Sequence, residues 1–248
     1  LAFFASCLSC SKSFLDRNPL DQISSGTFWQ TEDDVKMALA GCYRQLQSDF
    51  LSYRRVWLDC LSDNAFAQWD YFNIPAMTIG VTSPTSGGAV NMAYYTPYKG
   101  IANCNYFLEN VDKVPLDASK ITEYKGEVRF LRALMYFDLV DFFGDVILYR
   151  ETPESAEAAK VAKSPKADVL AFIHEDLDAA IASLPEEAYN GHAVKGSATS
   201  LKARVLLYEQ KWPEAASFAQ QTMQSGKFSI ADNYLGLFLT ATQGGNPE

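Results

Sequence analysis

Acidic side chains are the most plentiful groups in the sequence that could act as general acids or bases. Carboxylates three or four positions apart, such as Asp138 and Asp141, would share one face of a helix. A glycoside hydrolase needs two carboxylates across a cleft, one of them with a raised pKa. A chain with 30 Asp and Glu residues produces such spacings by chance, so the pairs are a poor basis for predicting hydrolysis.

Other groups that carry catalysis or bind metals are scarce. The only two histidines, His174 and His192, have no serine or cysteine nucleophile in a recognisable setting, so we expect them to be surface or capping residues. Cys7 and Cys10 are the only close cysteine pair, and no second pair exists to complete a metal site. We therefore expect no catalytic residue, no metal and no cofactor.

Charged residues also interrupt the most apolar helical stretch of the sequence. Glu127, Arg129 and Arg132 lie there among residues that must face a core. Charges in such a setting are more often buried or interfacial ion pairs that fix how helices pack than contacts to a ligand. The sequence thus predicts a structural role for all three.

Aromatic residues outside the helical stripes are the best candidates for binding. The segment from Asp63 to Val90 loses periodicity and is expected to be a long loop region. Sugar rings stack on aromatic faces, while acids and amides bind hydroxyl groups. The alternative stays open that these aromatics anchor the loop to the protein body, which is the commoner role of any single one. Our candidate ligand contacts are Trp69, Asp70, Tyr71 and Asn73.

Apolar residues recur every three or four positions along most of the chain, and strand-like alternation is almost absent. This pattern predicts an all-α protein of antiparallel helical hairpins with long irregular loops. One pair of helices resembles a tetratricopeptide unit through Ala203, Trp212, Ala215 and Ala219, although an ordinary hairpin would look the same. We expect helices that begin at Thr31 and that cover 56–61, 92–111, 118–143, 166–184, 198–209 and 213–225.

The N-terminal residues have the character of a secretory signal peptide. They form an apolar run with small residues near its end, too short for a transmembrane helix of about 20 residues. Cleavage after Ser9 would leave Cys10 as a lipid-bearing N-terminus, with Cys7 as the second candidate. We expect residual signal peptide over 1–9 and a tether over 10–30.

The net charge of −9 argues against binding to nucleic acid.

Several short strings, taken in order, resemble the SusD/RagB family of nutrient-uptake lipoproteins of the outer membrane. The first strings are 9–16 and Thr27-Phe28-Trp29. The strongest string covers 126–134 and runs on to Phe143-Gly144-Asp145-Val146. The segment 196–212 follows in the same order. Each string is modest alone, but the ordered set is specific and spans nearly the whole chain.

The resemblance implies a helical domain over 31–248 with tetratricopeptide-like hairpins, cut before its C-terminal half. It also implies a lipid-anchored, surface-exposed protein that binds oligosaccharides, or in some members peptides. Such a protein would deliver them to a SusC-like TonB-dependent transporter without catalysing a reaction. Two other functions stay open, namely a tetratricopeptide-type interaction scaffold without a small ligand and a surface glycoside hydrolase.

Overall fold

The computed structural model describes residues 28–47, 51–70, 72–83, 85–187, 191–231 and 233–239. Within these ranges the protein is helical and contains no strand, only an isolated bridge between Val146 and Ser164. The all-α prediction is confirmed. The α-helices are α1 (Glu32–Tyr43), α2 (Ile74–Thr78), α3 (Gly88–Asn110), α4 (Ala118–Phe143), α5 (Lys166–Ser183), α6 (Lys195–Tyr208) and α7 (Trp212–Gln224), and the 3₁₀ helices are η2 (Arg44–Gln47), η4 (Tyr53–Leu61), η5 (Val111–Lys113) and η6 (Tyr234–Phe238).

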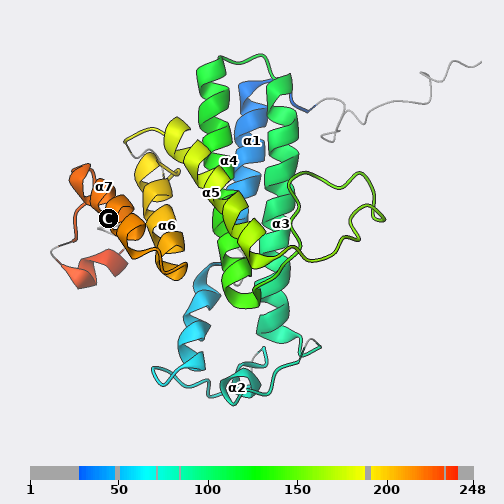
Figure 1. Ribbon diagram of the computed structural model, residues 1–248, viewed down its shortest axis with the longest axis vertical. Helices are drawn as coiled ribbons and strands as arrows, with labels where there is room; N and C mark the ends of the chain where they lie inside the picture. The colour runs from blue at the N-terminus through cyan, green and yellow to red at the C-terminus, as the bar shows by residue number, and fades with distance from the viewer. Residues whose placement is uncertain are drawn as a thin grey trace, which may run out of the picture.

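The tall part of the molecule is a bundle of α1, α3 and α4, with α5, α6 and α7 following in order to one side (Figure 1). Below the bundle lies what we call the lobe, which comprises η4, α2 and the described loop residues between 51 and 87. No helix in the described part of the chain is long and apolar enough to cross a membrane.

Helix α1 begins where the sequence predicts. Thr31 is the N-cap, and its hydroxyl accepts a hydrogen bond from the Asp34 backbone N–H at 3.3 Å. The Asp34 carboxylate accepts one in return from the Thr31 backbone N–H at 2.8 Å, which completes a capping box. The buried face of α1 is Val35, Leu39 and Cys42, and it packs on α3 and α4.

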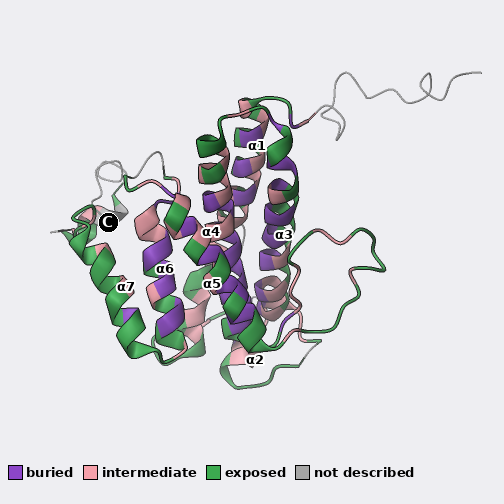
Figure 2. Ribbon diagram, turned by 45° about the horizontal axis from the view of Figure 1, so that its top comes forward, coloured by how far each residue is buried: buried purple, intermediate pink, exposed green. Residues whose placement is uncertain are grey.

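Helix α4 is the centre of the fold, and its bounds match the predicted range 118–143. It ends because Gly144 adopts a positive φ of 68°, which favours glycine. Close packing on α5 requires Gly126, since a Cβ there would lie 2.3 Å from the Ser183 hydroxyl. The part of α4 from Gly126 to Val140 is largely buried, whereas α7 is mostly exposed (Figure 2).

Arg132 confirms the predicted structural role of the charges in α4. Its guanidinium binds both carboxylate oxygens of Asp176 in α5 at 2.8 Å, and both side chains are buried. The remaining Nη1 donates to Asn105 Oδ1 of α3 at 2.7 Å and to the Arg150 carbonyl at 3.1 Å. One side chain thus joins three helices and the loop after α4.

Arg129 does not follow that pattern, because it forms no ion pair with any described residue. Glu127 bonds to residues outside this stretch, Tyr43 of α1 and His192. Its carboxylate is fully buried, and Oε2 lies 2.7 Å from His192 Nδ1. The prediction of ion pairs within this stretch is therefore right for Arg132 and wrong for Arg129.

The expectation that both histidines are surface or capping residues is wrong for His174, whereas the His192 side chain is 34% exposed. His192 pairs with buried Glu127, and His174 Nε2 lies 2.6 Å from Glu209 Oε2, with its side chain only 19% exposed. These contacts join segments 65 and 35 positions apart, a separation that local sequence does not reveal.

Three further expectations need correction. The segment 63–90 contains α2 and the start of α3, so it is not wholly a loop, and the helix expected over 56–61 is the 3₁₀ helix η4. Trp212 is 57% exposed and does not fill the turn between α6 and α7 as the tetratricopeptide pattern requires. Helix α7 contacts α6 through Phe218 and Thr222 but buries only Ala215, so most of its side chains face solvent.

Candidate functional site

The lobe carries a hollow of about 390 Å³ that we call the aromatic hollow. Its walls come from η4, the loop that follows it and the start of α2. Phe66 is 83% exposed and Trp69 is 76% exposed, so two large rings that line this one depression face solvent. The lining residues are Trp57, Cys60, Phe66, Ala67, Gln68, Trp69 and Ile74.

Two contacts fix the lobe to the helical body. The guanidinium of Arg55 in η4 forms a two-pronged bond with Asp138 of α4, at 2.7 and 2.8 Å, and the Asp138 side chain is 4% exposed. The hydrogen bonds to this buried carboxylate raise the pKa of Arg55, so the guanidinium stays charged.

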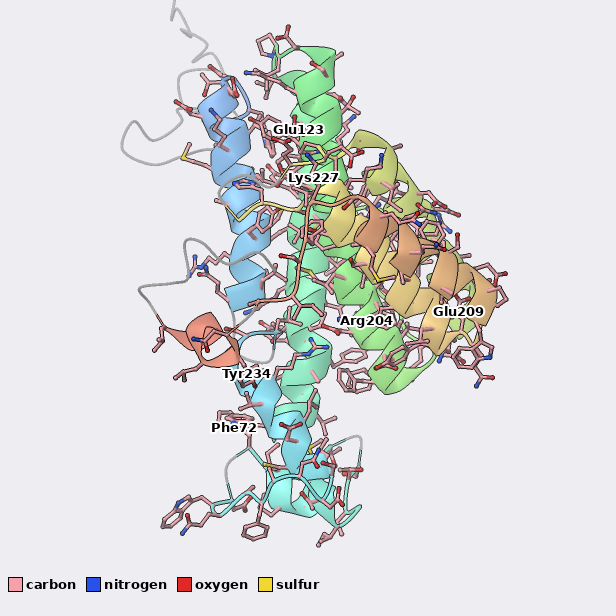
Figure 3. The ribbon with its side chains drawn as sticks, turned by 90° about the vertical axis from the view of Figure 1, so that its left-hand side faces the viewer. Phe72, Glu123, Arg204, Glu209, Lys227 and Tyr234 are labelled. Atoms are coloured by element: carbon pink, nitrogen blue, oxygen red, sulfur yellow. The ribbon has the colours of Figure 1, made fainter. Side chains whose placement is uncertain are left out.

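The second contact joins the far end of the lobe to the first turn of α3. The Phe72 carbonyl accepts a hydrogen bond from the Ala89 backbone N–H at 2.9 Å. A Cβ on Gly88 would lie 2.2 Å from that carbonyl oxygen, and Gly88 has a φ of 57°. Glycine is required here for both reasons. Phe72 also stacks on Trp57 with ring centroids 5.1 Å apart, and Figure 3 shows it at the lobe, away from Glu209 at the α6–α7 turn.

The four predicted ligand contacts do not have a common place in the structure. Trp69 lines the aromatic hollow, and the next residue, Asp70, is exposed. Asn73 braces the loop instead, because its Nδ2 donates to the Ser86 carbonyl at 3.2 Å and its backbone has a φ of 63°. Tyr71 and Cys10 lie outside the described residues.

Sequence reasoning missed two of the rings. The sequence pattern predicts only a helix at Trp57, and Phe66 is not among the predicted ligand contacts. The signal available for both was the density of aromatic residues on either side of an aperiodic segment.

Two neighbouring tyrosines of α3, Tyr94 and Tyr95, have different surroundings. Tyr94 packs against Tyr98 and Phe143, while Tyr95 is 54% exposed.

The chemistry of the aromatic hollow is that of binding. None of its described lining residues is acidic, basic or a histidine, so it offers apolar faces, the Gln68 amide and a thiol. Among the described residues, no group of three or more His, Cys, Asp and Glu side chains is arranged to hold a metal ion. Flat apolar walls with an exposed polar rim suit a ring with both C–H faces and hydroxyl groups.

A second cluster resembles a catalytic constellation in composition. The Tyr43 hydroxyl donates to Glu127 Oε2 at 2.5 Å and accepts from the Ala193 backbone N–H at 2.8 Å. Burial and the Glu127 carboxylate raise the pKa of Tyr43, so the phenol keeps its proton. Together with His192, these bonds tie α1, α4 and the start of α6 together, which is a structural role.

The chain resembles known proteins along most of its length. A family model described as "Starch-binding associating with outer membrane", of the SusD-like type, matches residues 13–207. The SusD-like protein P25 of Formosa agariphila is 28% identical over 94% of this chain and 46% of its own length. A SusD-like protein of Bacteroides ovatus is 23% identical over 93% of this chain and 44% of its own length.

Solved structures give the same result. A SusD-like carbohydrate-binding protein of Bacteroides fragilis superposes with a TM-score of 0.81 at 29% identity, over 90% of this chain and 46% of that chain. A laminarin-binding SusD-like protein gives a TM-score of 0.78 at 27% identity, over 89% of this chain and 50% of that chain. The chain therefore spans about half the length of the proteins that it matches.

Proposed function

The chain belongs to the SusD-like family, and from this membership and the geometry of the lobe we propose that it binds oligosaccharides at the cell surface. It captures them for a partner SusC-like TonB-dependent transporter and performs no catalysis. The observation that carries the proposal is the aromatic hollow, in which Phe66 and Trp69 expose their rings within one depression.

Physical chemistry supports a sugar as the ligand. Large exposed aromatic rings are costly to leave in water, so a site that keeps two of them exposed gains free energy when a ligand covers them. A pyranose ring covers an indole with its C–H face and keeps its hydroxyls at the rim, where Asp70 is exposed. Because one solved relative binds laminarin, laminarin oligosaccharides are a natural first probe.

The test is calorimetric titration of the full chain with a panel of neutral oligosaccharides that includes laminarin fragments. Trp69→Ala is expected to weaken binding about three- to tenfold, the size of a lost aromatic contact. Trp212→Ala is the matched control, because Trp212 is also exposed but lies at the start of α7, far from the lobe. Equal affinities of wild type and Trp69→Ala, or equal losses in both variants, would contradict the proposed site.

The anchor and the transporter are separate parts of the proposal. We propose Cys10 as the lipidated residue, so palmitate labelling should disappear in Cys10→Ala. Labelling that persists in this variant would move the anchor to Cys7. Co-purification with a TonB-dependent transporter from outer membranes tests the partner, and its absence under conditions that retain the lipid would contradict delivery.

A further inference from the structure

A larger hollow lies on the body, between the end of α1 and the middle of α3. It has a volume of about 920 Å³, and we call it the α1–α3 hollow. Figure 1 shows the two helices side by side. The residues that matter for the argument are Arg44, Gln47, Tyr95, Thr96 and Lys99, which all line this hollow.

The frame of the α1–α3 hollow is close-packed. Asn103 Nδ2 of α3 donates to the Gly41 carbonyl of α1 at 3.3 Å. A Cβ on Gly100 would lie 3.2 Å from the Gln45 Cβ, so α3 approaches η2 closely here. The side chains of the hollow therefore project from helices that hold each other in place, which preorganises them for a ligand.

The charge of this hollow is opposite to that of the chain. The net charge is −9, and many described cations are ion-paired, for example Lys120 with Glu32 and Lys125 with Asp112. Arg44 and Lys99 are both exposed, and no carboxylate among the described residues lies within 4 Å of either.

The lining also contains no Asp or Glu among its described residues. Two positive charges thus share one hollow with no negative side chain to balance them.

A second hollow, next to the α1–α3 hollow, has a different set of charged residues. It shares Arg44 and Gln47 with the first and adds Lys36 and His192 on its other side. There the added basic groups have carboxylate partners, because Lys36 lies 3.3 Å from Glu32 and His192 lies 2.7 Å from Glu127. The two cations without such a partner among the described residues are therefore Arg44 and Lys99, and only the α1–α3 hollow contains both.

The side chains around the two cations suit a sugar. Lys99 Nζ lies over the Tyr95 ring, 4.4 Å from its centroid, and the ring remains 54% exposed. A guanidinium such as that of Arg44 binds carboxylate or sulfate oxygens in two-pronged fashion. An exposed aromatic ring that shares one hollow with two cations and the Gln47 amide combines a stacking surface with anion recognition.

We propose that the α1–α3 hollow binds an acidic sugar unit, one that carries a carboxylate or a sulfate group. The proposal rests on the glycan-binding function proposed above, which it extends from the aromatic hollow to a second place on the molecule. Arg44 and Lys99 bind the anionic group, and Tyr95 supports the ring.

The experiment titrates the full chain with three probes: short oligogalacturonates, carrageenan oligosaccharides and neutral laminarin fragments. We expect at least one acidic probe to bind. Arg44→Gln and Lys99→Gln should each weaken it about three- to tenfold, the size of a charged contact near the surface, and leave the neutral probe unchanged. Raising the salt from about 0.05 M to about 0.5 M should weaken only the acidic probe.

Controls separate charge at the site from net charge. Lys163→Gln removes one exposed positive charge from the loop before α5, and it should bind like wild type. Lys99→Arg keeps the cation and should retain most of the affinity. Because Arg44 and Lys99 are exposed, their variants should unfold at the wild-type temperature.

The outcomes are distinguishable. The carboxylated and the sulfated probe show which anionic group the hollow takes, and preference for either supports the proposal. Binding of the neutral probe with no binding of the acidic ones overturns this inference and leaves the proposed function intact. Acidic binding that both variants retain, or that Lys163→Gln loses equally, also overturns it. Failure of every probe overturns both proposals.

Discussion

The helical body and the lobe use different residue types for opposite purposes. In the body, Arg132 and Asp176 are buried and fully engaged with each other and with the neighbouring backbone. In the lobe, Phe66 and Trp69 are exposed and line an open hollow. The buried charges of the body thus stabilise the fold, whereas the exposed rings of the lobe, on a short and irregular segment, are available to a ligand.

This contrast follows from the cost of burying charge. A buried ion pair is retained only when its geometry and its additional hydrogen bonds repay desolvation. The Arg132 guanidinium meets that condition with four acceptor contacts across α3, α5 and the loop after α4. For an exposed ring, the unfavourable free energy of contact with water lasts only until a partner covers the ring.

The strongest test of the contrast is Asp176→Ala in the body. The variant leaves the Arg132 guanidinium buried without its carboxylate, so the free energy of unfolding should fall by about 3–5 kcal/mol. Urea titration measures it. The double variant Arg132→Met with Asp176→Leu should recover much of the loss, because both charges are then gone. A loss below about 1 kcal/mol in Asp176→Ala would show that the pair is not the structural centre we describe.

A smaller effect is expected where the lobe meets the body. Arg55→Ala leaves the nearly buried Asp138 carboxylate unpaired, which should cost about 1–3 kcal/mol. The loss is smaller than in the body because Arg55 is 42% exposed, so its removal admits water to the carboxylate. Amide hydrogen exchange should accelerate in η4 and leave α4 and α5 protected. Unchanged hydrogen exchange in η4 would contradict the inference that Arg55 fixes the lobe to the body.

The smallest effect concerns the surface of the body, where pairs are screened by water. Hydrogen bonds from Lys120 and Tyr124, followed by Lys36, lower the pKa of Glu32 from 4.5 to about 2. A lowered pKa favours the folded state above pH 4.5, and this contribution is lost as the pH falls towards about 2.

Glu32→Gln should therefore flatten the pH dependence of the melting temperature over that range. Glu154→Gln, which changes an exposed glutamate in the loop before α5, is the control and should keep the wild-type slope. Parallel curves for wild type and Glu32→Gln would show that the link from α1 to the start of α4 adds nothing measurable.

The sequence predicts the long helices well, because each carries enough apolar periodicity and a clear stop. Helix α4 is the best example, with an apolar stripe over many turns and Gly144 directly after it. Helix α2 was missed because five residues are too few to show a period. The 3₁₀ character of η4 was missed because its apolar spacing differs little from that of an α-helix.

The candidate site was predicted less completely for a related reason. Trp69 stood out by type and by its place in an aperiodic segment, and the structure puts it in the aromatic hollow. Asn73 matched by type alone, yet its amide braces the loop. Pairings such as Glu127 with His192 depend on how distant helices meet, which no single stretch of sequence encodes.

The double attachment of the lobe also has an entropic consequence. Arg55 and Gly88 are both fixed to the body, so the chain between them is a closed loop of about 30 residues and cannot explore the volume open to a free segment. Trp69 lies inside that closed loop. Folding has therefore already ordered the segment that lines the aromatic hollow. When a ligand binds there, less of the binding free energy is lost in ordering the protein.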